Sequence, residues 1–290
     1  MLHICRPTTV ESSTQPQNCP VYQPYMQCIK CPEPEGAETI GDALLKRFDL
    51  EIRSLVDLSH PHIVKILDVG VEDGHPYVVT QYLLGGSLRD RMNGGPGGQP
   101  GPMPIQSLWD WLMDVAAALD FIHSQNYLHR DVKPENILFD RFGDAFLADF
   151  GIIKMLSGGP EDWRSNRITA PGLLMGTPNY VAPEVVLGQG EDPRIDQYSL
   201  AITVHEVITG SNCMEGPSPS ATMVNQTKIE PPLLSGLIPG VRDRTAEAVR
   251  RGLSKEAMTR SLAHDSPRPP DGGSLGFAFA GRASHDGAVA

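Results

Sequence analysis

The spacing of apolar residues predicts helices in four stretches of the chain. In each stretch, mostly apolar side chains recur every three or four residues, which places them on one helical face. The sets are Leu44, Phe48, Ile52 and Leu55; Leu108, Leu112, Val115, Leu119 and Ile122; the run 195–210; and Val241, Thr245, Val249 and Leu253. The run 195–210 is apolar on most faces, so that helix is expected to be buried.

Short runs rich in β-branched and aromatic residues predict strands at 25–31, 63–71, 75–83, 137–140 and 145–150. The strands concentrate before residue 84. A Pro- and Gly-rich loop at 93–104 precedes the mainly helical remainder. We therefore predict an α+β protein with a poorly ordered segment at 1–24, a small β-rich lobe at 25–83, a larger α-helical lobe at 84–264 and a disordered tail at 265–290.

Composition narrows the functional classes. The net charge of −11 disfavours binding to nucleic acid or to anionic membranes. No apolar run approaches the length of a membrane span, and the first residues lack the apolar core of a signal peptide. Five scattered cysteines indicate a reducing compartment, so we expect a cytoplasmic protein.

The stretch "HRDVKPEN", residues 129–136, carries the groups that phosphoryl transfer to a hydroxyl needs. Asp131 could accept or orient the hydroxyl proton, and Lys133 could stabilise charge on the transferred group. Asn136 offers a neutral oxygen to Mg²⁺, and Asp149 of "DFG" offers a charged one. Gly151 allows a sharp turn after this motif.

The motifs "HRDVKPEN", "DFG" and "GTPNYVAPE" together resemble the signature set of eukaryotic-type (Hanks-type) serine/threonine protein kinases. The resemblance covers roughly residues 25–262 and implies a bilobal protein-kinase-like fold with ATP and Mg²⁺ bound between the lobes. It implies that Asp131 is the catalytic base, that Lys133 and Asn136 assist it, and that Asn136 and Asp149 hold the metal.

The resemblance also assigns nucleotide-binding residues. "QCIK" matches the strand whose lysine holds the phosphates, which is Lys30, and Glu51 on the following helix would orient that lysine. Thr80 would be the gatekeeper before a hinge at 81–83, so Gln81, Leu83 and also Leu138 are expected to contact adenine. An apolar stack of Leu55, Ile66, His129 and Phe150, anchored by Asp196, would join the lobes.

The resemblance also implies which hydroxyl groups accept the phosphate and how the enzyme would be regulated. Lys133 in "HRDVKPEN" is typical of kinases that phosphorylate Ser and Thr hydroxyls of proteins, and Thr177 would shape a site for a short hydroxyl. Arg130 would pair with a phosphorylated segment between 149 and 184. Autophosphorylation candidates are Ser157, Ser165 and Thr169. Glu184 should form a buried ion pair with Arg260.

The start of the chain departs from the family. No Gly-rich loop precedes Lys30, and Pro16, Pro20 and Pro24 lack the N–H donors that such a loop requires. The small lobe is therefore expected to be incomplete. Two explanations compete: a shortened reading of a longer gene, or a catalytically impaired, pseudokinase-like binding module.

A zinc site built from Cys5, Cys19, Cys28 and Cys31 is a weaker alternative. On a strand, Cys28 and Cys31 would point to opposite faces. We expect Cys28 to pack over adenine instead.

Overall fold

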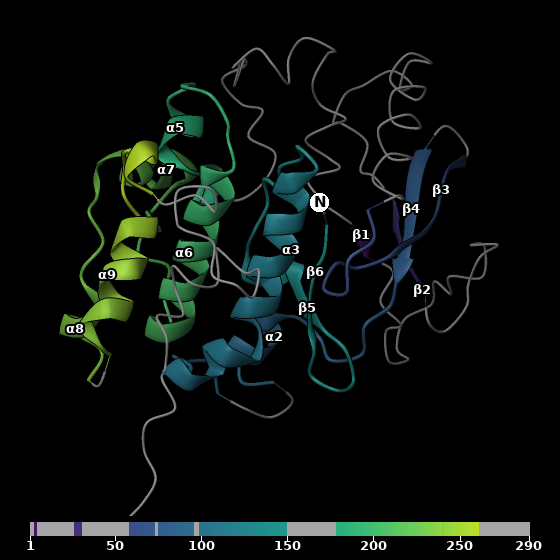
Figure 1. Cartoon of the computed structure of the whole chain (residues 1–290), viewed down its shortest axis with the longest axis horizontal. Helices are drawn as coiled ribbons and strands as arrows, with labels where there is room; N and C mark the ends of the chain where they lie inside the picture. Colours follow the sequence, from purple (N-terminus) through teal and green to yellow (C-terminus); the bar gives the residue numbers. More distant parts are fainter. Residues whose placement is uncertain are drawn as a thin grey trace, which may run out of the picture.

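The structure of the protein is a computed structural model, which describes residues 3–4, 26–30, 58–72, 75–95, 99–149, 178–239 and 241–260. In Figure 1 the four-stranded sheet lies at one side and helices α5 to α9 lie at the other. Helix α3 and the hairpin β5–β6 lie between them. This arrangement agrees with the predicted α+β fold of a β-rich part and a larger helical part.

The described sheet is antiparallel, with strand order β1-β2-β4-β3. Its strands are β1 (His3–Ile4), β2 (Met26–Lys30), β3 (Ile66–Glu72) and β4 (His75–Gln81). Strands β2, β3 and β4 lie where the sequence predicted them. Strand β1 was not predicted, because two residues are too few to show an alternating pattern.

The helical part is built around one buried helix, α6. Described elements of this part, in chain order, are α2 (Leu88–Met92), η1 (Ile105–Asp110), α3 (Leu112–Ser124), η2 (Pro134–Asn136), β5 (Ile137–Phe139), β6 (Ala145–Leu147), η3 (Pro178–Tyr180), α5 (Pro183–Val186), α6 (Arg194–Thr209), α7 (Pro219–Lys228), α8 (Leu234–Leu237), α9 (Asp243–Gly252) and η4 (Ala257–Thr259). Side chains from Ile195 to Ile208 are all buried, as the apolar run predicted. The helix ends at Gly210, whose φ of 77° closes it in the left-handed conformation that glycine favours.

Helix α3 begins later than its apolar pattern predicted. Leu108 lies in the 3₁₀ segment η1, and Trp111 interrupts the helix with the non-helical angles φ −152° and ψ −29°. The indole of Trp111 is buried, so a large core side chain lies at the residue where the two helical segments meet. The predicted face at Leu112, Val115, Leu119 and Ile122 packs into the core.

The segments just before β3 and just after β4 dock onto the hairpin β5–β6 through main-chain contacts. Val64 N–H donates to the carbonyl of Leu147 at 2.9 Å, and Gly85 N–H donates to the carbonyl of Phe139 at 2.8 Å. A side chain at Gly85 would place its Cβ 2.7 Å from the carbonyl oxygen of Phe139, so this close approach requires glycine. The hairpin that meets the sheet also follows directly on residues 129–136.

The predicted ion pair between Glu184 and Arg260 is present. Arg260 Nη1 and Nη2 donate to the two carboxylate oxygens at 2.6 and 3.0 Å, and both side chains are buried. The pair ties α5 to the end of the described helical part. None of the described helices combines the length and apolar character needed to cross a bilayer.

Candidate active site

Asp131 is held by the two polar side chains that the sequence grouped with it. Lys133 Nζ lies 2.6 Å from Asp131 Oδ2, and Asn136 Nδ2 donates to the same oxygen at 2.9 Å. Asn136 Nδ2 also donates to the main-chain carbonyl of Asp131 at 2.8 Å. Lys133 and Asn136 therefore both contact the Asp131 carboxylate, and the ammonium group of Lys133 is the cation beside it.

The loop that carries Asp131 is anchored on helix α6 by Asp196. The two Asp196 oxygens accept the main-chain N–H groups of His129 at 2.8 Å and Arg130 at 2.7 Å, and His123 Nε2 lies 2.8 Å from Oδ2. Burial acts to raise the pKa of Asp196, but the hydrogen bond and charge of His123 outweigh it and hold that pKa below its usual range. Asp196 thus stays ionised and fixes the loop, and its bond to His129 N–H is the contact expected for one member of the predicted apolar stack.

His129 links this loop to the residue before Asp149. A carbonyl oxygen can only accept, so His129 Nε2 donates to the Ala148 carbonyl at 2.9 Å. A main-chain N–H can only donate, so Nδ1 accepts from Asp131 N–H at 3.3 Å. Both bonds together require a neutral ring, and burial lowers the pKa of His129 in agreement. Ala148 N–H in turn donates to the Asn136 carbonyl at 2.8 Å.

Asp149 is brought next to Asp131 by these bonds. Its φ of 56° lies in the left-handed region, where a non-glycine residue is strained and is often found at functional sites. Burial, together with the nearby charge of Asp131, raises the pKa of Asp149 to about 6, although Lys133 opposes the shift. Two carboxylates that repel each other in a partly buried position favour a bound cation.

The donor set fits Mg²⁺. Asn136 uses its amide nitrogen on Asp131, which leaves its amide oxygen available to a metal ion, and Asp149 would add a carboxylate. Among the described residues no group of three or more His, Cys, Asp or Glu side chains is arranged to hold a metal. Mg²⁺ takes oxygen ligands such as an amide oxygen and a carboxylate and completes its shell with phosphates and water.

Two of the three predicted adenine contacts, Leu83 and Leu138, lie in one apolar cluster. Leu83 is buried with Val64 and Ala148, and Leu138 packs against them. Gln81 ends β4, and its N–H donates to the Lys65 carbonyl at 2.9 Å. Through this cluster Leu83, in the predicted hinge, and Leu138 pack with Ala148, the residue that precedes Asp149.

Several predicted residues fall outside what the structure describes. Lys30 is the last residue of β2, opposite Tyr77, and only its main chain is described. The others lie outside the described residues: Glu51, Leu55, Phe150, Ser157, Ser165, Thr169 and Thr177. Their roles, and the role of the Lys30 side chain, stay predictions.

Two charged contacts were not foreseen. Arg130, expected to pair with a phosphorylated segment, has its Nε 2.6 Å from Glu191 Oε2. Arg89 on α2 contacts Glu135, Tyr180 and Glu206. Glu206 is 117 residues away from Arg89 in sequence, so no local spacing could have signalled this contact.

Comparisons with known proteins show which family the chain resembles. The family model described as a protein kinase domain matches residues 24–256. Serine/threonine-protein kinase PknL of Mycobacterium tuberculosis is 32% identical over 245 residues, which cover 79% of this chain and 58% of PknL. PknF of the same species is 36% identical over 203 residues, which cover 67% of this chain and 40% of PknF. The chain thus spans less than two thirds of these curated relatives.

A solved structure supports the fold. The crystal structure of the Mycobacterium tuberculosis PknI kinase domain, determined for a cysteine-to-alanine mutant, superposes with a TM-score of 0.63. It is 24% identical and covers 90% of this chain and 86% of that one. The predicted bilobal kinase fold is confirmed, and the chain belongs to the protein kinase family.

Proposed function

We propose that this protein is an ATP-dependent serine/threonine kinase that transfers the γ-phosphoryl group to protein hydroxyls. The observation that carries the proposal is the arrangement around Asp131, where Lys133 and Asn136 share one carboxylate oxygen. The relatives named serine/threonine-protein kinases support the choice of acceptor.

The described residues suit the roles that the transfer requires. Asp131 would accept the proton of the Ser or Thr hydroxyl while the hydroxyl oxygen attacks the γ-phosphorus and the bond to ADP breaks. Lys133 would stabilise charge on the transferred phosphoryl group. Asn136 and Asp149 would hold Mg²⁺, which neutralises the phosphates when bound.

The nucleotide would lie between the sheet and the hairpin β5–β6. Leu83 and Leu138 would contact adenine, with the main chain of Gln81 to Leu83 as hydrogen-bonding partner. Lys30, oriented by Glu51, would hold the α- and β-phosphates. We place this activity in the cytoplasm, in keeping with the use of cysteine, and Ser157, Ser165 and Thr169 remain candidates for autophosphorylation.

A phosphorylation assay tests the proposal. The purified protein is incubated with ATP, Mg²⁺ and a Ser/Thr-rich protein, and phosphate is mapped by mass spectrometry. Asp131→Asn should lower the rate by roughly 100-fold or more, because the base is lost. Asp144→Asn, which neutralises an exposed carboxylate in the β5–β6 turn, is the matched control and should retain activity.

Equal phosphate transfer by wild type and Asp131→Asn would remove Asp131 from the mechanism. The absence of a Gly-rich loop before Lys30 motivates one alternative, a kinase-like module that binds partners without transferring phosphate. Transfer by wild type that depends on Asp131 would rule that alternative out.

A further inference from the structure

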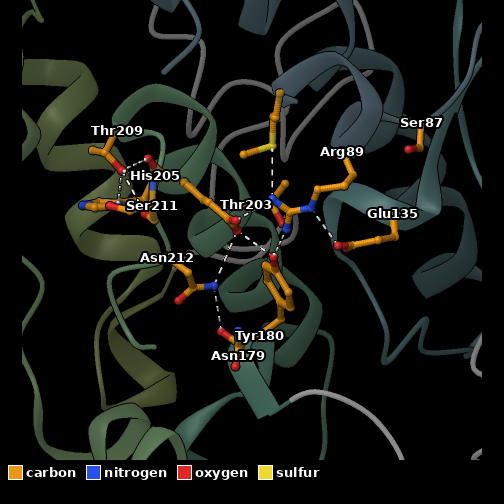
Figure 2. Close-up of polar contacts among 12 residues, drawn as sticks. Ser87, Arg89, Glu135, Asn179, Tyr180, Thr203, His205, Thr209, Ser211 and Asn212 are labelled. Atoms are coloured by element: carbon orange, nitrogen blue, oxygen red, sulfur yellow. Dashed lines mark hydrogen bonds and ion pairs between the residues drawn. The ribbon is translucent and has the colours of Figure 1, made fainter. Parts of the chain in front are cut away.

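Arg89 on α2 is surrounded by oxygen atoms from three other elements (Figure 2). Its Nε donates to Glu135 Oε1 at 2.8 Å, its Nη1 to Glu206 Oε1 at 2.7 Å and its Nη2 to Tyr180 Oη at 2.6 Å. We call Glu135, Tyr180 and Glu206 the acceptor cluster. Each guanidinium nitrogen of Arg89 therefore has an oxygen partner in this cluster.

The acceptor cluster is built to receive a guanidinium. Burial and the charge of Glu206 raise the pKa of Tyr180, so its phenol stays protonated and donates to Glu206 Oε2 at 2.6 Å. The Glu206 side chain is 7% exposed and that of Glu135 is 44% exposed, so the cluster runs from the core to the surface. Two carboxylates and a phenol match the planar fork of arginine better than they match a lysine.

The acceptor cluster lies beside the catalytic loop. Glu135 directly precedes Asn136 and follows Asp131 by four residues, so the Asp131 and Glu135 Cα atoms are at most about 14 Å apart. An extended peptide covers that distance with about four residues. A substrate with its hydroxyl at Asp131 can therefore bring a neighbouring side chain to Glu135.

We propose that Arg89 fills, from within the chain, the position that an arginine of the substrate would otherwise take. Arg89 is then a specificity-determining residue: it makes the enzyme indifferent to basic residues near the acceptor hydroxyl. This inference rests on the proposed kinase function. The competing view is that Arg89 only ties α2 to α6 and η2 and has no bearing on substrate choice.

Peptide kinetics separate the two views. The substrates are peptides in which one position at a time, within about four residues of the acceptor Ser, is either Arg or Ala. For wild type, this exchange should change kcat/KM by less than about threefold at every position. For Arg89→Ala, Arg at one position should raise kcat/KM by about tenfold or more, through a lower KM, because charged hydrogen bonds to the acceptor cluster become available.

Three variants serve as controls. Arg89→Lys keeps a cation in the cluster and should gain no preference for Arg. Arg244→Ala removes the same charge from an exposed site on α9 and should behave as wild type. Arg89→Ala combined with Glu135→Gln should lose most of the gain. A folded Arg89→Ala that gains no preference for Arg at any position would overturn the inference.

A binding measurement keeps the inference testable if wild type transfers no phosphate. Millimolar methylguanidinium should raise the melting temperature of Arg89→Ala, and should not raise that of wild type or of the variant that also carries Glu135→Gln. If Arg89→Ala does not fold, Arg89→Gln, which keeps most of the aliphatic stem, replaces it in both experiments. Equal shifts in all proteins would show that the cluster does not select a guanidinium.

Discussion

Breaking the buried pair of Glu184 and Arg260 is expected to destabilise the helical part strongly. Arg260 is 1% exposed and donates to both oxygens of Glu184. Its remaining acceptors are neutral carbonyls: that of Ser254 at 2.9 and 2.7 Å and that of Arg194 at 3.2 Å. Glu184→Ala would therefore leave a buried guanidinium without a counter-charge.

The expected cost is about 3–5 kcal/mol, the range for removing one partner of a buried ion pair. This is a large part of the roughly 5–15 kcal/mol by which a typical domain is stable. Glu184→Gln keeps one good acceptor and should cost less, about 1.5–3 kcal/mol. Replacing both residues, Glu184→Leu with Arg260→Met, should be less harmful than Glu184→Ala, because no buried charge is left alone.

The assay is urea unfolding followed by far-UV circular dichroism, without nucleotide or metal. Glu247→Ala is the control, since it breaks the exposed pair of Glu247 with Arg250 on α9 and should leave the urea midpoint close to that of wild type. A loss below about 1 kcal/mol for Glu184→Ala would refute the reasoning. The reasoning would also be refuted if the variant with Glu184→Leu and Arg260→Met were less stable than Glu184→Ala.

Three further changes test other parts of the structure. Asp196→Asn should lower kcat in the phosphorylation assay and cost about 2–4 kcal/mol in urea unfolding, because an amide cannot accept at both atoms; wild-type values would contradict the anchoring role. Gly85→Ala should cost about 2 kcal/mol or more in thermal unfolding, since its Cβ would press on the Phe139 carbonyl, whereas Gly236→Ala meets no neighbour and serves as control. Burial lowers the pKa of Lys255 to about 8, so the folded protein binds this proton more weakly than the unfolded chain does. Lys255→Met should therefore stabilise by roughly 2 kcal/mol at pH 7, with the gain fading as the pH rises through 8 towards 10.5; a pH-independent gain would contradict this.

The sequence alone predicted the parts of the fold whose pattern is strong and local. Strands β2 to β4 and the all-buried helix α6 lie where alternation and apolar runs placed them. Asp131, Lys133 and Asn136 could be grouped because they share one short loop. The pairing of Glu184 with Arg260 came from the family resemblance, since no local pattern joins residues 76 positions apart.

The sequence could not predict features that depend on distant partners or on a single main-chain angle. The break at Trp111 interrupts an apolar pattern that looks continuous. The contacts of Arg89 reach Glu135 and Glu206, which lie 46 and 117 residues away. The left-handed conformation of Asp149 is likewise a single main-chain angle that no apolar or alternating pattern marks.

The anchoring of the loop at 129–136 on Asp196 has a consequence for hydrogen exchange. Functional loops usually belong to the least stable parts of a protein and open through local fluctuations. Here the amides of His129 and Arg130 are bonded to a fully buried carboxylate on the central helix, so exposing them to exchange breaks two hydrogen bonds to a buried charge. These two amides should therefore be among the slowest in the molecule to take up deuterium, so the loop that would receive the substrate is already set before any ligand arrives.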